Sequence, residues 1–493
     1  MRSLHRLPSS CVPFGRTVAA ACAVVLASCG GGGGDGGGGP IGGTSIGLAP
    51  SSTLAQQCTA ELEKSFLRSW IDETYLWYQD VRTLPATTLD PSGYATPEAY
   101  FEVLKTPLTT ASGKAKDEFH FIYDTAAWTA LSQSGIAYGY GFQVALQSSS
   151  PPRRAVVAFT EPGTPSAANG IGRGAEILSI DGVDFVNGAD AATLNAGLFP
   201  TGTGSHTFTI RDFGASATRS VTMTAQQITQ TPVQNVRTLP APNQNVGYLL
   251  FNDHIATSEA LLVAAIEQLR AAGVSDLVLD LRYNGGGYLD IASELAYMIA
   301  GPANTSGKFF ERLSFNDRNP FNRSVADNTT PFHPVSQAFS GPPGQPLPSL
   351  DLSRVYVLTS PDTCSASEAI VNGLRGAWVA VHLIGGTTCG KPYGFFPRDN
   401  CGTTYFAIQF FGVNFAGFGD YSDGFAPTCA VADDFAHALG DPDENQLEVA
   451  LALRSTGACV APLGTRPGAL ALGDAPQRPV LVRSPLRENR IYR

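Results

Sequence analysis

A serine and a lysine in the last third of the chain have types and a spacing that could support nucleophilic catalysis. Ser365 and Glu368 stand at the beginning of an expected helix, and Lys391 follows Ser365 by 26 residues in a glycine-rich turn. A serine at a helix N-terminus gains from the next backbone N–H, which faces a developing oxyanion. The S-x-x-E spacing also fits a simple helix cap. This segment alone favours the cap.

A second segment joins an apolar strand to a glycine turn. Asp280-Leu281-Arg282-Tyr283-Asn284 is followed by three glycines, Gly285 to Gly287, and then by an expected helix. Such a turn exposes backbone N–H groups at a helix N-terminus, where an anion can bind. A nucleotide-binding P-loop is excluded because no Lys-Ser or Lys-Thr pair follows. A tight turn without chemistry explains this segment, taken alone, equally well.

The elements around both segments alternate between strands and helices. Strands are expected at 246–251, 277–281, 355–358 and 378–384, and helices at 258–272, 288–300 and 366–375. This alternation predicts an α/β domain whose mostly parallel sheet is covered by helices. We expect residues 302–348, which are rich in proline, serine and asparagine, to form a long surface loop, and the chain after about Pro462 to be irregular.

A glycine-punctuated β region precedes this α/β pattern. It opens with Gly139-Tyr140-Gly141-Phe142, continues through Gly172–Gly182, and closes with strands expected at 206–211 and 220–224. Glycines allow successive backbone N–H groups to converge on a carboxylate, and an adjoining strand edge can pair with an extended peptide. The pattern predicts a site for peptide C-termini, with a glycine-rich hairpin without a binding role as the alternative.

Together these segments resemble the carboxyl-terminal processing, or tail-specific, serine proteases. That family carries a PDZ domain, then a strand ending in LRxNxGG, an SASE serine-helix motif and a GxxTxGK lysine turn, all present here in the same order. The resemblance covers about residues 101–453. It includes Lys116-Asp117-Glu118-Phe119 before the PDZ domain and Asp441–Leu453 near the end.

The resemblance implies a multidomain α+β protein and a serine endopeptidase with a Ser/Lys dyad. Ser365 would attack the scissile carbonyl, and Lys391 would take and later return the proton. A neutral lysine is required, so burial should lower its pKa to about 7–8. The oxyanion hole would use the N–H of Ala366 and one from Gly286 or Gly287. Substrates would be proteins or peptides whose apolar C-termini the PDZ domain captures.

Two departures from the family pattern leave alternatives open. The family commonly has a glutamine four residues after the lysine, whereas this chain has Phe395. Cys364 and Cys389 flank the expected nucleophile and base, which is unusual in the family, and they either form a disulfide that stiffens the site or leave a thiol that gates it. The rival functions are an inactive PDZ-containing peptide-binding scaffold and a Ser/Lys esterase or amidase for small molecules.

The N-terminus predicts export and lipid anchoring. Three arginines precede an apolar stretch, Thr17–Ala27, which is too short to span a bilayer permanently. Leu26-Ala27-Ser28-Cys29 resembles a bacterial lipobox, so Cys29 is the predicted lipidation site. Gly30, rather than aspartate, follows the cysteine. We therefore expect a lipid-anchored protein of the bacterial cell envelope, on the periplasmic face of the outer membrane if the cell has two membranes.

Composition and cysteine content limit the remaining possibilities. The 493 residues carry a net charge of −10, which argues against a nucleic-acid partner. Neither CxxC nor HExxH occurs, so we expect no metal and no other cofactor. Removing Cys11, Cys22 and Cys29 leaves six cysteines, which allow 15 pairings. We favour Cys389–Cys401.

These observations predict six consecutive regions. They are a signal peptide (1–29), a glycine-rich tether (30–56), a helical N-terminal domain (57–134) that opens with an amphipathic helix near Thr59–Tyr78, a PDZ domain (135–228), the catalytic domain (229–460) and an irregular tail (461–493).

Overall fold

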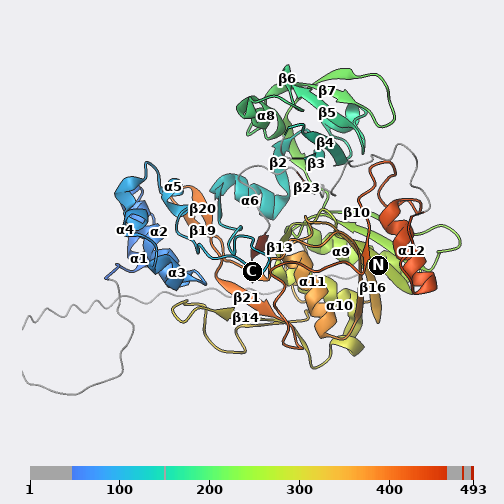
Figure 1. Ribbon diagram of the computed structural model, residues 1–493. Coiled ribbons are helices and arrows are strands. Elements are labelled where there is room, and N and C mark those ends of the chain that lie inside the picture. Colours follow the sequence, from blue (N-terminus) through green and yellow to red (C-terminus); the bar gives the residue numbers. More distant parts are fainter. Residues whose placement is uncertain (1–46, 149–150, 463–479, 482–489, 493) are drawn as a thin grey trace, which may run out of the picture. The chain divides into compact units, whose positions relative to one another are not determined.

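The computed structural model describes residues 47–148, 151–462, 480–481 and 490–492 (Figure 1). Residues 49–493 form one compact unit, and the unit before it spans residues 1–48. The predicted lipidation site Cys29 and most of the glycine-rich tether lie outside the described residues. Among the helices of the described part, none combines the length and the apolar character needed to cross a membrane.

A six-stranded sheet forms the centre of the catalytic domain. Its order is β10 (Val233–Thr238), β11 (Val246–Phe251), β12 (Asp276–Asp280), β16 (Arg354–Thr359), β17 (Ala380–Gly385) and β22 (Cys429–Ala430). Only β10 runs antiparallel to its neighbour; the other pairings are parallel. The predicted parallel sheet is therefore confirmed.

Helices cover both faces of this sheet. Leu249, Leu279 and Val357 pack in one core with residues of α9 (Ser258–Ala271), α10 (Leu289–Thr305) and α11 (Ala366–Gly376). The alternate positions Leu250, Val278 and Leu358 pack in a second core with residues of α12 (Asn445–Thr456). Burial on both faces explains why these strands read as continuous apolar runs.

The stretch expected to be a long loop contains secondary structure. After α10, which extends to Thr305, β14 (Phe309–Phe315) and β15 (Thr329–Pro331) join β21 (Phe410–Val413) and β18 (Tyr393–Gly394) in a four-stranded sheet. The expectation of an irregular loop was wrong for β14 because its Phe310 and Leu313 are buried in the core. Because prolines and asparagines surround this short apolar run, the sequence pattern does not indicate a strand there.

The N-terminal region is helical and joined to the catalytic domain. It contains α1 (Ser51–Leu54), α2 (Ala60–Thr74), α3 (Tyr78–Arg82), α4 (Ala86–Leu89), α5 (Pro97–Phe101) and, after strand β1 (Phe121–Asp124), α6 (Thr125–Ser134). The Thr59 side chain caps α2 by accepting from the Leu62 N–H. Strand β1 pairs with β20 (Thr403–Phe406), which in turn pairs with β19 (Arg398–Asn400).

The PDZ region has the expected β-rich fold. Its main sheet runs β3 (Phe142–Ser148), β4 (Arg154–Thr160), β5 (Glu176–Ile180), β7 (Ser205–Arg211) and β8 (Arg219–Thr224). Short β6 (Val183–Asp184) pairs with β5, helix α8 (Ala191–Leu198) lies between β6 and β7 in sequence, and β2 (Ile136–Gly139) pairs with β9 (Gln226–Thr229).

The tail is not irregular throughout. Two pieces of it are short strands, β23 (Val480–Leu481) and β24 (Arg490–Tyr492). Strand β23 adds to the PDZ sheet beside β3, and β24 pairs with β13 (Gly286–Tyr288) of the catalytic domain. The sequence offers little signal for either strand, because each is too short to show a periodic pattern.

The six cysteines of the described chain form three disulfides, Cys58–Cys401, Cys364–Cys389 and Cys429–Cys459. The predicted pair Cys389–Cys401 was wrong. Cys401 lies in the turn between β19 and β20, which contacts the N-terminal region through a hydrogen bond from the Gln56 N–H to Asn400 Oδ1. Spacing along the chain could not reveal a partner 343 residues away.

Candidate active site

Ser365 occupies a strained turn between β16 and α11. Its φ is 65°, in the left-handed region that costs a non-glycine residue roughly 1–3 kcal/mol. Ser365 and Glu368 occupy the positions of a capping box, and the Ser365 N–H donates to Glu368 Oε2 at 2.9 Å. The Ser365 Oγ, however, is buried and has no hydrogen-bond partner in the described chain. The hydroxyl faces the Glu368 N–H as in a capping box, but no well-formed hydrogen bond holds it there.

Lys391 lies in the turn after β17, and its side chain is completely buried. The Nζ atom is 4.2 Å from the centroid of the Phe395 ring and 4.7 Å from that of Phe119. Phe119 belongs to the segment before the PDZ domain, so the N-terminal region contributes to the surroundings of the lysine. Phe395, the departure from the family pattern, packs against the amino group that a glutamine would have been expected to orient.

Glu368 connects the serine turn to the lysine turn. Its Oε2 accepts from the N–H groups of Ser365 and Lys391, at 2.9 and 2.8 Å, and its Oε1 accepts from Thr388 Oγ1 and the Gly390 N–H, at 2.5 and 2.9 Å. Burial raises the pKa of Glu368, and these hydrogen bonds oppose the rise. One buried carboxyl group therefore fixes both backbone segments, a role that the sequence, read as S-x-x-E, did not reveal.

The Cys364–Cys389 disulfide is a second link between the same two turns. Of the two possibilities that the sequence left open, a disulfide and a free thiol, the structure has the disulfide. Among the described residues, these two cysteines and Glu368 form the one cluster of metal-ligand side chains. Its sulfurs are bonded to each other, so they are not available as the thiolates that bind a metal.

The glycine turn after β12 lies against the serine turn. The Asn284 carbonyl oxygen accepts from the Cys364 N–H at 3.1 Å and from Ser367 Oγ at 3.1 Å. The Asn284 side chain accepts from the Gly286 N–H at 2.9 Å and donates to the Phe251 carbonyl at 3.0 Å. Asn284 thereby orients the whole turn, a role that its place in the LRxNxGG motif does not reveal.

These contacts narrow the candidates for the oxyanion hole. The Gly286 N–H is engaged by Asn284. The remaining candidates are the Gly287 N–H, on the edge of β13 that pairs with β24, and the Ala366 N–H at the first position of α11. Gly287 has a φ of 145°, and a Cβ there would lie 2.4 Å from the His254 carbonyl oxygen, so only glycine fits.

His254 is a further buried residue that sequence reasoning missed. Its Nδ1 hydrogen-bonds Asn284 Oδ1 at 2.9 Å, and burial lowers its pKa to about 3, so the ring is neutral. A neutral ring that donates through Nδ1 fixes the Asn284 amide orientation. A single histidine between a strand and a helix carries no motif that could have indicated this.

A buried ion network joins the PDZ domain to the end of β12. Arg282 pairs with Asp280, with Glu444 at 2.8 Å and with Asp433 at 2.9 Å. Arg173 of the PDZ domain pairs with the same Asp433 at 2.6 Å. A buried charge without its partner is costly, so this network fixes the PDZ domain against the strand that leads to the glycine turn.

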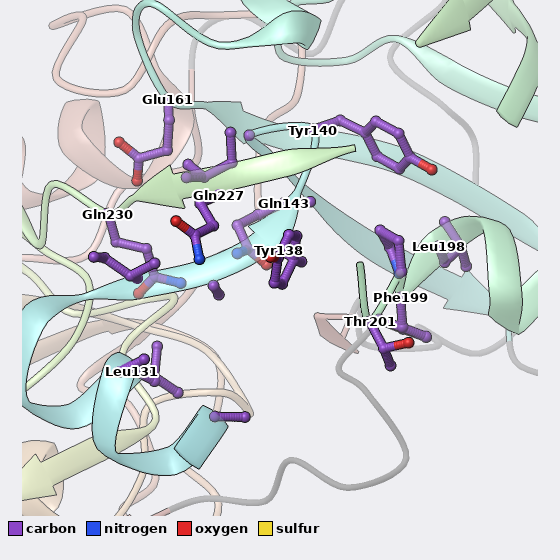
Figure 2. Close-up of a pocket in the computed structure, with 18 of the residues that line it drawn as sticks. Leu131, Tyr138, Tyr140, Gln143, Glu161, Leu198, Phe199, Thr201, Gln227 and Gln230 are labelled. Carbon is purple, nitrogen blue, oxygen red and sulfur yellow. The ribbon is translucent and has the colours of Figure 1, made fainter. Parts of the chain in front are cut away.

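The predicted carboxylate loop lines a cavity of about 720 Å³ (Figure 2). The walls include Gly139, Tyr140, Gly141 and Phe142, together with residues of α6, β9 and the end of α8. Gly141 has a φ of 91°, and a Cβ there would lie 2.3 Å from the Thr164 side chain.

Glu161 is a titratable group on the wall of this cavity (Figure 2). Burial raises its pKa to about 7, and hydrogen bonds from the Thr231 N–H and Gln234 oppose the rise. Its charge therefore changes near neutral pH, in the cavity where a peptide carboxylate is expected to bind.

Comparisons with known proteins agree with this architecture. The model for peptidase family S41 matches residues 245–398, that for the S41 N-terminal domain matches residues 63–119, and that for the PDZ domain matches residues 130–196. A structure from Bacteroides fragilis assigned to the S41 proteases has a TM-score of 0.61 and 23% identity, covering 80% of this chain and 97% of that one. At that identity the likeness shows the fold alone.

Two curated relatives are carboxyl-terminal processing enzymes. The protease of Picosynechococcus sp. is 27% identical over 53% of this chain and 56% of that protein. The chloroplastic peptidase 2 of Arabidopsis thaliana is 31% identical over 33% of this chain and 32% of that protein. The chain thus spans little more than half of the first relative and a third of the second. The S41 N-terminal, PDZ and S41 peptidase matches follow one another along this chain in that order, and together with these relatives they support a protein similar to the carboxyl-terminal processing peptidases with a PDZ domain.

Proposed function

We propose that this protein is a serine endopeptidase that uses Ser365 and Lys391 as a catalytic dyad. One observation carries the proposal: the buried Ser365 hydroxyl, which has no hydrogen-bond partner among the described residues, lies in a turn that Glu368 ties directly to the backbone of Lys391. A serine serving only to cap a helix would use its hydroxyl for that purpose.

The chemistry follows from these positions. Ser365 Oγ attacks the carbonyl carbon of the scissile bond while Lys391 takes the hydroxyl proton. The N–H groups of Gly287 and Ala366 stabilise the tetrahedral oxyanion. When the C–N bond breaks, Lys391 gives the proton to the leaving amine, and the acyl group stays on Ser365 as an ester. Water, deprotonated by Lys391, then hydrolyses the ester and restores the enzyme.

The proposed substrates are proteins and peptides with apolar C-termini. In this proposal the Gly139–Phe142 loop receives the terminal carboxylate, and the edge of β3 pairs with the peptide backbone. The cavity beside the loop and the ion network between Arg173 and Asp433 support a role for the PDZ domain in presenting substrate to the catalytic domain.

The proposed location is the cell envelope, with the folded part held to the membrane by lipid on Cys29. Support comes from the lipobox-like Leu26-Ala27-Ser28-Cys29 and from the disulfides, which form in oxidising compartments.

The test is cleavage of an unfolded protein that carries an apolar C-terminal tail, with products identified by mass spectrometry. We expect cleavage to continue in the presence of a metal chelator. The same substrate with a charged tail should be cut more slowly, mainly through a higher KM, because its capture is weaker. Failure to cut either substrate would support the scaffold alternative.

A further inference from the structure

Two short strands from the tail lie on edges that a substrate would use. Strand β23 pairs antiparallel with β3, with Val480 opposite Leu146 and Leu481 opposite Ala145. Strand β24 pairs in parallel with β13, and its Ile491 lies opposite Gly287. Both strands lie outside the matched regions, which cover residues 130–196 for the PDZ domain and residues 245–398 for the S41 peptidase.

The first edge is where a peptide would join the PDZ sheet. Strand β3 follows the Gly139–Phe142 loop directly, and its other edge is paired with β4. In the sheet order β23-β3-β4, strand β3 would be the edge strand without β23 (Figure 1). A peptide that binds by strand addition needs this same edge. It therefore cannot bind there while β23 is in place.

The second edge belongs to the proposed oxyanion hole. His254 occupies one side of β13, because its N–H donates to the Gly286 carbonyl at 3.3 Å and its carbonyl accepts from the Tyr288 N–H at 2.9 Å. Backbone groups alternate in direction along a strand. The Gly287 N–H and carbonyl therefore face the opposite edge, where β24 lies. A peptide presenting its carbonyl to the Gly287 N–H would need the same space.

The opposite net charges of the tail and of the rest of the chain favour binding of the tail to its own chain. Residues 463–493 contain six arginines and two acidic residues, a net charge of +4, while the chain as a whole carries −10. The remaining residues therefore carry −14. A basic segment linked to an acidic protein is attracted to it, and the covalent link gives it a high effective concentration.

We propose that the tail is an intramolecular ligand of both edges and competes with substrate for them. The role of the PDZ edge is independent of catalysis, whereas the role at β13 rests on the proposed function. Each edge can be tested separately, because proline removes the backbone N–H that a strand needs. Leu146 turns its backbone groups toward β23 opposite Val480, so Val480→Pro addresses the β3 edge. Gly287 accepts from the residue after Ile491, so Tyr492→Pro addresses the β13 edge. Val480→Ala and Tyr492→Ala, which keep the N–H, are the matched controls.

Hydrogen exchange measured by mass spectrometry reports occupancy without requiring activity. In the full chain carrying Ser365→Ala, Val480→Pro should speed exchange within residues 142–148, and Tyr492→Pro should speed it within residues 286–288. Deleting residues 463–493 should do both, while exchange in β4 stays unchanged and shows that the fold is intact. Unchanged exchange at both edges after the deletion would overturn the proposal.

Peptide affinity gives the second measurement. The deletion should tighten binding of a free apolar-tailed peptide by about tenfold or more, because a linked competitor acts at roughly millimolar effective concentration. Adding a synthetic peptide of residues 478–493 should reverse that gain. Equal affinity with and without the tail would refute competition at the PDZ edge. If the protein cuts nothing yet these effects appear, the proposed function fails while the intramolecular ligand stands.

Discussion

Glu368→Gln keeps the size of the side chain at the centre of the site but reduces the number of hydrogen bonds that the side chain can accept. The carboxyl group receives four hydrogen bonds, two on each oxygen, from the serine turn and the lysine turn. In glutamine one of these oxygens becomes an NH₂ group, so two donors lose their acceptor. Each bond to a charged acceptor is worth about 1.5–3 kcal/mol, which gives a gross loss of roughly 3–6 kcal/mol.

Part of that loss is offset because glutamine buries no charge, and burial already raises the pKa of Glu368. We expect a net decrease of about 2–4 kcal/mol in the free energy of unfolding. Displacing the serine relative to the lysine should also lower kcat by about 10²-fold.

Thermal unfolding and steady-state cleavage of an apolar-tailed substrate measure the two effects, and binding of the tail peptide should not change. Glu267→Gln, an exposed glutamate on α9, is the matched control and should behave like the unmodified protein. If Glu368→Gln retained the original kcat and melting temperature, the idea that Glu368 couples the two turns would be refuted.

Four further perturbations test other parts of the account. Replacing Cys364 and Cys389 by alanine together should destabilise the protein by about 3 kcal/mol in the chain-entropy model and lower kcat, measured by thermal unfolding and cleavage; unchanged values would mean the disulfide does not hold the site. Amidating a peptide's C-terminus should weaken its binding by about 1.5–3 kcal/mol for each charge-assisted hydrogen bond lost, and calorimetry that finds equal affinities would exclude a carboxylate site. Affinity for the free carboxylate should fall as pH rises through about 7, where Glu161 loses its proton, and Glu161→Gln should remove that dependence. Cys29→Ser should shift the protein from the detergent phase to the aqueous phase, and unchanged partitioning would contradict the lipid anchor.

The central sheet could be predicted because its strands are buried on both faces. Residues 246–251 and 277–281 are nearly continuous apolar runs, and the helices between them have regular spacing. Strand β14 was missed because prolines and asparagines surround its short apolar run. A strand or helix can be predicted from hydrophobic periodicity only when the periodic run is longer than the polar and proline-rich segments that interrupt it.

The site shows a different limit. Motifs bring Ser365 and Lys391 to attention, but the carboxyl group that joins their turns was interpreted as part of a helix cap. Asn284 and His254 act through contacts between separate strands and loops, and Phe119 reaches Lys391 from the N-terminal region. The disulfide partner of Cys401 lies 343 residues away. Tertiary packing determines these contacts between residues that are far apart in the chain. The spacing of residues in a single sequence therefore does not reveal them.

The most direct test of the dyad is to measure cleavage and tail-peptide binding together in three variants. Ser365→Ala and Lys391→Ala should each lower kcat by about 10⁴-fold or more while leaving peptide affinity unchanged, because a nucleophile and its base fail as a unit. Ser367→Ala, which loses one hydrogen bond to the Asn284 carbonyl, should lower kcat far less. The account would be contradicted if Ser365→Ala cut substrate at the original rate and only lost a cap-sized stability of about 1 kcal/mol.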